Sequence, residues 1–132
     1  MADMAFEAEW TPSQTDFDRF ARISGDDNPI HVDPDFSART RFGRTVSHGM
    51  LLYSRVWALI RKAAPAQSHE MQSLMFPNPA YAGEELVIRV GNAEEAGPGR
   101  LQVSVRRKSD DAVVLQGECM LEEGAGNDAG RG

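Results

Sequence analysis

Hydrophobic and polar side chains alternate at the start of the chain, where glutamates separate Phe6, Ala8 and Trp10. This period of two is typical of a strand with one buried face. Four later segments also have strand character, at residues 71–76, 85–90, 101–107 and 112–121. Turn residues separate them at 91–92, 97–99 and 109–111. The short last turn predicts an antiparallel hairpin.

A helical period appears between the first strand and the others. Phe17, Phe20 and Ala21 follow the i, i+3, i+4 spacing of a helix that can begin at residue 11 or 13 and that Gly25 ends. Residues 47–64 form the most apolar segment of the chain. Their apolar side chains wrap most of the circumference of a helix that is roughly 25 Å long, which is typical of a helix buried in the core.

Together these elements predict an α+β domain in which an antiparallel sheet curls around a long central helix. A sheet of this size covers only part of an apolar helix, so we expect dimerisation that extends the sheet and covers the rest. The 132 residues suit one domain, residues 1–123. The tail, residues 124–132, has nothing to bury and is predicted to be disordered.

Composition then narrows the classes of function. The net charge of −6 argues against nucleic acid as a partner. No segment is apolar enough for a membrane span and the start of the chain does not read as a signal peptide, so we expect a soluble, cytoplasmic protein. Cys119 is the only cysteine, and the spacing of the three histidines supports no metal site. We therefore expect no disulfide and no metal.

The charge is unevenly distributed along the chain. Residues 36–69 contain six basic residues and no acidic one. Within this region Arg41 and Arg44 precede the predicted central helix, and they are candidates for binding a small polyanionic ligand.

The segment 24–33 concentrates polar side chains that can handle protons. Gly25 can adopt the left-handed conformation and Pro29 fixes its own φ, so we expect a rigid, non-helical bend. On such a bend, Asp26 and His31 can share a water molecule and exchange protons with a substrate. The alternative is an ordinary loop whose Asp and Asn side chains cap backbone amides and whose histidine lies at the surface.

Three blocks of sequence resemble one family. F-A-R-I-S-G-D-D-N-P-I-H-V-D, F-G-R-T-V-S-H-G-M-L-L and F-P-N-P-A-Y-A-G-E-E-L are similar to the MaoC-like (R)-specific enoyl-CoA hydratases of the hot-dog fold. The resemblance covers about residues 13–122, and the first block contains the family's Gly-Asp-x-Asn-Pro-x-His motif. It implies a hot-dog homodimer that reversibly hydrates trans-2-enoyl-CoA to (R)-3-hydroxyacyl-CoA without metal or organic cofactor.

The motif also assigns roles to residues. By the resemblance, Asp26 and His31 are the catalytic pair and Asn28 supports them. Asp27 fills the variable position with a second carboxylate, which leaves the electrostatics of the pair open. Which member of the pair acts on the water is not decided by the sequence.

The chemistry of hydration requires more groups than this pair. The charge that develops on the thioester oxygen needs a donor, and the amide of Gly49 at the start of the central helix is the predicted one. Ser47 is the predicted N-cap of that helix, with substrate contact as the alternative. His48 is either a packed residue or a catalytic one. Arg41 and Arg44 are predicted to contact the CoA phosphates, and Tyr53, Trp57 and Phe76 are either walls of the acyl tunnel or plain core.

Two other functions compete with hydration. A hot-dog acyl-CoA thioesterase would direct water at the thioester carbonyl, but the Asn-Pro-x-His spacing after Asp26 argues against it. A non-catalytic acyl-CoA-binding subunit of a heterodimeric dehydratase would not need both Asp26 and His31.

Overall fold

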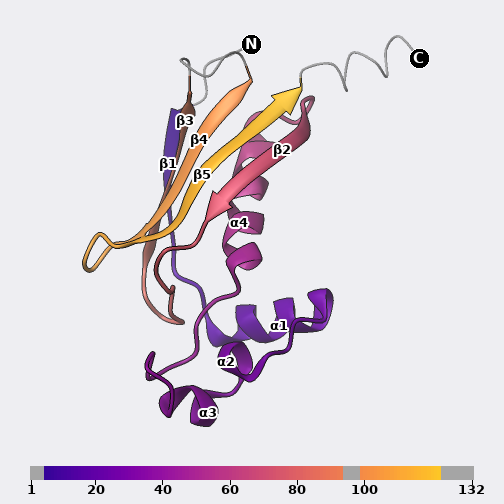
Figure 1. Cartoon of the computed structure of the whole chain (residues 1–132). Coiled ribbons are helices and arrows are strands. Elements are labelled where there is room, and N and C mark those ends of the chain that lie inside the picture. The colour runs from indigo at the N-terminus through magenta and orange to yellow at the C-terminus, as the bar shows by residue number, and fades with distance from the viewer. Residues whose placement is uncertain (1–4, 94–98, 123–132) are drawn as a thin grey trace.

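The computed structural model of the chain describes residues 5–93 and 99–122. In chain order its elements are β1 (Ala5–Trp10), α1 (Gln14–Ser24), α2 (Pro29–Val32), α3 (Pro34–Ala38), α4 (Gly49–Ala63), β2 (Ser68–Met75), β3 (Leu86–Asn92), β4 (Arg100–Arg107) and β5 (Val113–Glu122). The strands and α4 form two layers, and α1, α2 and α3 gather beyond one end of the sheet (Figure 1). None of the described helices is long and apolar enough to cross a membrane.

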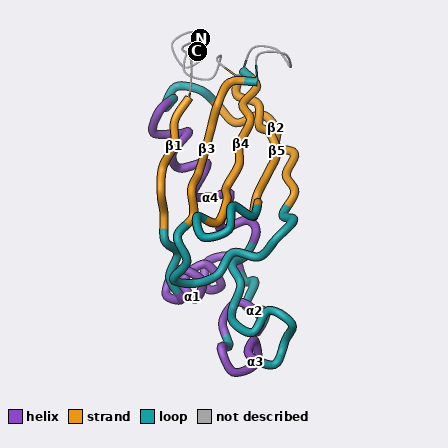
Figure 2. Tube along the Cα trace, turned by 90° about the vertical axis from the view of Figure 1, so that its left-hand side faces the viewer, coloured by secondary structure: helices purple, strands orange, loops and turns teal. Residues whose placement is uncertain are grey.

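The five strands form one antiparallel sheet in the order β1-β3-β4-β5-β2. Figure 2 shows them side by side, with α4 behind the sheet. The predicted antiparallel sheet and the β4–β5 hairpin are therefore confirmed. The turn predicted at 91–92 is wrong, because both residues lie in β3 and pair with residues 102 and 101 of β4. Residues 97 and 98, and the predicted disordered tail, lie outside the described residues.

Helix α1 starts at the second of its two candidate positions. Ser13 is its N-cap, and it forms a capping box in which the Ser13 hydroxyl accepts from the Asp16 amide at 3.1 Å and the Asp16 carboxylate accepts from the Ser13 amide at 2.9 Å. Gly25 ends the helix with a φ of 82°, in the left-handed region that glycine adopts without steric cost. The chain therefore enters the polar segment at a defined angle.

The polar segment differs from the predicted non-helical bend. Pro29–Val32 form the one-turn helix α2, and Asn28 caps it by accepting a hydrogen bond from the Ile30 amide at 3.1 Å. The reason is that proline at the first helical position loses no intrahelical hydrogen bond and already has a helical φ. Proline displaces only the residue before it from the helical region, and Asn28 is extended.

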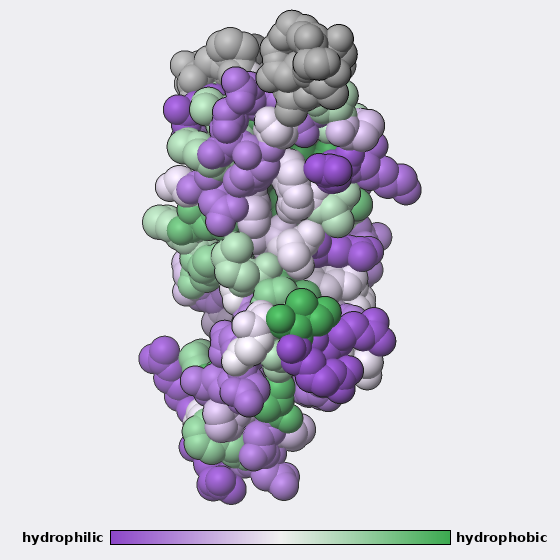
Figure 3. Space-filling view, turned by 90° about the vertical axis from the view of Figure 1, so that its right-hand side faces the viewer, coloured by the Kyte–Doolittle hydropathy of each residue, from purple (hydrophilic) through white to green (hydrophobic). Residues whose placement is uncertain are grey.

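Helix α4 packs one face against the sheet. Leu52, Tyr53, Val56 and Ile60 are buried on this face and join the core with the inward side chains of the strands. The opposite face is uncovered, and Met50 is 46% exposed. Figure 3 views this side of the molecule and shows apolar and neutral side chains at its surface. A single sheet therefore covers only one side of α4, as the size of the predicted sheet led us to expect.

Candidate active site

Asp26 and His31 lie close together beyond the end of the sheet. Asp26 is in the loop between α1 and α2, and His31 is in α2. The His31 Nε2 and Asp26 Oδ2 atoms are 3.8 Å apart, and their side chains are 14% and 56% exposed. This separation is too long for a direct hydrogen bond, but a water molecule about 2.8 Å from each atom can join them.

Hydrogen bonds fix the orientation of the His31 ring. Its Nδ1 lies 2.8 Å from the Val46 carbonyl oxygen. A carbonyl only accepts, so Nδ1 carries the hydrogen and, in the neutral ring, Nε2 presents its lone pair toward Asp26. The Val46 amide donates in return to the Ile30 carbonyl at 3.0 Å, and the Gln14 side chain donates to the His31 carbonyl at 2.9 Å. The ring and its backbone are thus held from two sides.

His48 contacts both members of this pair. It is 3% exposed, its ring stacks on the His31 ring with centroids 3.9 Å apart, and its Nε2 donates to the backbone carbonyl of Asp26 at 2.8 Å. Burial lowers the pKa of His48, the hydrogen bond to Asp26 opposes this shift, and the neighbouring His31 adds to it. His48 is therefore a neutral, packed imidazole at neutral pH.

The three side chains form a cluster with potential metal ligands. One ligand atom each of Asp26, His31 and His48 lies within 4.8 Å of the others. However, the two rings are stacked with centroids 3.9 Å apart at an interplanar angle of 23°, so their lone pairs lie in two nearly parallel planes, which does not favour tetrahedral ligation of one ion. The arrangement suits proton transfer better than metal binding.

Gly49, the next residue, opens α4 and lines a cavity of about 240 Å³ together with Arg41 and Phe76. Its amide is among the first-turn N–H groups that have no acceptor within the helix. A β-carbon at this position would lie 3.0 Å from the Phe76 ring. Gly49 therefore borders a cavity in which a larger side chain would meet Phe76. Neither Asp26 nor His31 lines that cavity.

The predicted cap of this helix is wrong by one residue. His48, with extended backbone angles and no side-chain cap, precedes the first helical residue. The Ser47 hydroxyl instead donates to the His48 carbonyl at 2.9 Å, and the Ser47 amide donates to the Ala80 carbonyl. Ser47 cannot cap the first turn because the chain is still extended at His48.

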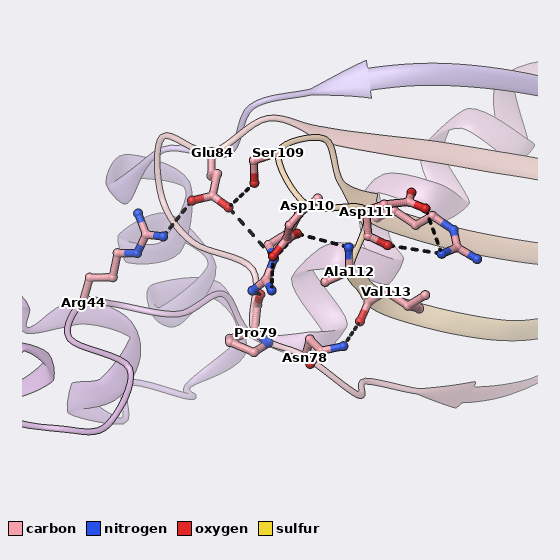
Figure 4. Close-up of polar contacts among 11 residues, drawn as sticks. Arg44, Asn78, Pro79, Glu84, Ser109, Asp110, Asp111, Ala112 and Val113 are labelled. Carbon is pink, nitrogen blue, oxygen red and sulfur yellow. Dashed lines mark hydrogen bonds and ion pairs between the residues drawn. The ribbon is translucent and has the colours of Figure 1, made fainter.

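The two candidate arginines differ in their partners. Arg44 donates to the Glu84 carboxylate at 2.7 Å and lies 3.8 Å from the Tyr81 ring centroid. Figure 4 shows Glu84 between Arg44 and Ser109. Arg41 lies against Phe42 and on the wall of the cavity that contains Gly49. Of the two, Arg41 has the position that suits a substrate contact.

The predicted tunnel residues do not lie together. Phe76 lines the cavity at Gly49, whereas Tyr53 and Trp57 line a separate hollow of about 360 Å³ with His69. The Tyr53 hydroxyl and His69 Nε2 share a hydrogen bond of 2.7 Å, and the Trp57 ring meets the His69 ring edge-on. Burial raises the pKa of Tyr53. The structure does not bring Tyr53 or Trp57 to the Asp26–His31 pair.

Sequence reasoning missed several supports of the site. Gln14 links α1 to the His31 carbonyl and accepts from the Thr45 hydroxyl at 2.6 Å. Val46 contributes only backbone atoms, and every residue type has these, so the sequence gives no sign of its role. The sequence contains one sign of a role for His48, which is that it directly precedes Gly49. It did not identify Asp26 and His31 as the partners of His48.

Known proteins resemble this chain in sequence and in fold. A family model described as "MaoC like domain" matches residues 2–113. A 3-hydroxybutyryl-CoA dehydratase of Methylorubrum extorquens is 33% identical over 113 residues, 83% of this chain and 72% of that protein. An (R)-specific enoyl-CoA hydratase of Aeromonas caviae is 41% identical over 73 residues, 54% of each chain. The unliganded R-hydratase structure from Pseudomonas aeruginosa superposes with a TM-score of 0.82 at 27% identity, over 92% of this chain and 80% of that one. These matches confirm the predicted hot-dog fold.

Proposed function

Because this chain belongs to the family of MaoC-like domains, we propose that it is a hydro-lyase acting on acyl-CoA. The reaction is the reversible addition of water to a trans-2-enoyl-CoA to give an (R)-3-hydroxyacyl-CoA. One observation carries the proposal: a carboxylate and an imidazole 3.8 Å apart, on a segment that hydrogen bonds hold from two sides. The names of the dehydratase and hydratase relatives support the same class of reaction.

The pair handles a single water molecule. The water lies between Asp26 and His31, its oxygen forms the new bond to C3, and its proton passes to the His31 Nε2 lone pair. The Asp26 carboxylate stabilises the imidazolium, which then gives the proton to C2. Dehydration follows the same steps in reverse, so no oxidant, metal or organic cofactor enters the balance.

The electrons displaced from the double bond gather on the thioester oxygen. The Gly49 amide, at the positive end of α4, is in our proposal the donor that stabilises this charge. The position of Gly49 at the 240 Å³ cavity and that of Arg41 on the same cavity wall support entry of the CoA thioester from this side. Ser47 and Asn28 act by shaping the backbone beside the reacting groups.

A second copy of the chain completes the protein in this proposal. Strand β2 is an edge strand of the described sheet and lies beside α4 (Figure 1), so a homodimer would cover both this edge and the exposed face of α4. Sedimentation equilibrium should therefore give the mass of two chains, and the mass of one chain would contradict the proposal.

The reaction is tested directly with crotonyl-CoA. The purified protein should remove the enoyl absorbance without releasing free thiol, and chiral chromatography should identify the product as the (R)-isomer. Thiol release would instead indicate the thioesterase. Loss of neither signal, with acyl-CoA binding retained in calorimetry, would indicate the non-catalytic binding subunit.

A further inference from the structure

His48 contacts three separate segments of the chain. Its ring meets Phe20 of α1 edge-on at 4.8 Å, stacks on His31 of α2 at 3.9 Å and donates to the carbonyl of Asp26 at 2.8 Å. It also precedes Gly49, whose amide begins α4. No other described side chain contacts both members of the Asp26–His31 pair in this way.

The hydrogen bond from His48 holds the loop around Asp26, which has few other hydrogen bonds among the described residues. The Asp26 residue is exposed, and its amide donates one local hydrogen bond, to the Ser24 hydroxyl oxygen at 3.1 Å. The His48 bond spans 22 residues and ties the carbonyl of Asp26 to the start of α4. The position of the carboxylate relative to His31 therefore depends on this long-range bond.

The second ring nitrogen of His48 makes no hydrogen bond within the described chain. Nδ1 is buried and has no hydrogen-bond partner among these residues. The titratable groups that face His48 are His31 on α2 and Asp26 in the preceding loop, and α1 contributes only the uncharged Phe20. A second proton, on Nδ1, would give the ring a buried positive charge without a hydrogen-bond partner. The ring therefore stays neutral, with its single hydrogen on Nε2, which donates to the Asp26 carbonyl.

We propose that His48 is a positioning residue that holds the Asp26 backbone and the His31 ring at the separation that admits one water molecule. This inference rests on the proposed hydration, and it assigns His48 no contact with substrate. Its Nε2–H fixes the loop that carries Asp26, and this bond sets the distance of the carboxylate from His31.

Two matched variants separate the hydrogen bond from simple packing. His48→Gln places an amide NH₂ near the position of Nε2 and keeps the donor to Asp26. His48→Asn places its NH₂ near Nδ1 instead and loses that donor, although it has similar polarity. Val56→Ala, in the buried face of the same helix, serves as the control for lost stability.

For crotonyl-CoA hydration, His48→Asn should lower kcat by about 10²-fold with little change in KM, because a misplacement on the order of 1 Å costs about this factor. His48→Gln should recover most of this loss and remain within about fivefold of the wild type. Val56→Ala should melt at a lower temperature and keep its kcat. Equal loss in the Gln and Asn variants, or loss in KM alone, would overturn the proposal.

A spectroscopic measurement keeps this test independent of turnover. Long-range ¹H–¹⁵N spectra report the environment of the two His31 ring nitrogens. Both variants lose the stacked ring, but His48→Asn should shift the His31 Nε2 signal further than His48→Gln, because only the Asn variant releases the Asp26 loop. If the wild type hydrates no enoyl thioester, the proposed function fails, but these spectra still decide whether His48 holds the pair. Equal shifts of the His31 Nε2 signal in the two variants would overturn the positioning role.

Discussion

The three histidines lie in two clusters with different environments. His31 and His48 stack beside the Asp26 carboxylate, and both rings donate to backbone carbonyls. His69 meets Trp57 edge-on and bonds to the Tyr53 hydroxyl, and the partners of its ring in the described chain are aromatic side chains without a carboxylate. Both clusters contain an imidazole against another ring, so ring contact alone does not identify a catalytic histidine.

The difference lies in what each imidazole can exchange. The His31 Nε2 has no direct hydrogen bond within the described residues and faces an exposed carboxylate. The His69 Nε2 is occupied by a tyrosine hydroxyl whose pKa burial raises, so that hydroxyl stays protonated. A proton-transfer site requires an available nitrogen with a charged neighbour and access for water, and only the first cluster combines them among the described residues.

The strongest test removes the acid–base groups of the first cluster. Asp26→Asn and His31→Gln should each lower kcat for enoyl-CoA hydration by about 10²- to 10⁴-fold, because general acid–base catalysis contributes that much. Steady-state kinetics with crotonyl-CoA measure the effect, and circular dichroism checks the fold. Asp27→Asn is the matched control, since the Asp27 side chain makes no hydrogen bond or ion pair with any described residue. An equal loss in that control would contradict the assignment.

A second test asks whether substrate reaches the first cluster from the Gly49 cavity. Arg41→Ala should raise KM for the CoA thioester about tenfold and leave kcat nearly unchanged, because it removes a phosphate contact remote from the reacting atoms. Arg44→Ala is the matched comparison. Since Arg44 already pairs with Glu84, its loss should change KM less and cost at most about 1 kcal/mol of stability. A larger KM effect from Arg44 would reverse the assignment of the two arginines.

The third test concerns the second cluster. Tyr53→Phe removes a buried hydroxyl that bonds to His69, so the free energy of unfolding should fall by about 1 kcal/mol in urea titration. The kcat for hydration should stay within about threefold of the wild type. A strong rise in KM would instead place Tyr53 in the acyl tunnel, where the sequence had suggested it as one of two alternatives.

The smallest expected effect is a dependence of stability on pH. Burial lowers the pKa of His48 below its ordinary value of 6.5, so between these two values the unfolded chain binds more protons than the folded one. The contribution of neutral His48 is therefore complete above pH 6.5 and is lost as the pH falls through the lowered pKa. His48→Gln should lose less stability than the wild type over the same range in urea titrations. Parallel curves for the two proteins would show that His48 titrates normally.

The repeating patterns of the chain predicted most of its fold. Alternation at Phe6, Ala8 and Trp10 predicted β1, and the other four strands were placed within a few residues. The patterns failed where two rules compete. Gly91 and Asn92 are turn formers by type, yet ladder pairing with β4 keeps them in β3.

The site was predictable in part for a related reason. The motif placed Asp26 and His31 together because they lie five positions apart on one short segment. It could not reveal that Val46 and Gln14 hold His31, since the contacts are to or from backbone atoms and span 15 and 17 residues. The uncovered face of α4, by contrast, was expected from the small size of the predicted sheet.

The placement of α1, α2 and α3 beyond the end of the sheet affects how the protein can lose activity. None of its described residues belongs to the main core cluster, and its ties to the rest include the His48–Asp26 bond and the Val46–Ile30 bond. A region with so few buried contacts opens at a lower free energy than the sheet. We therefore expect warming to reduce the fraction of molecules able to catalyse before it unfolds the sheet.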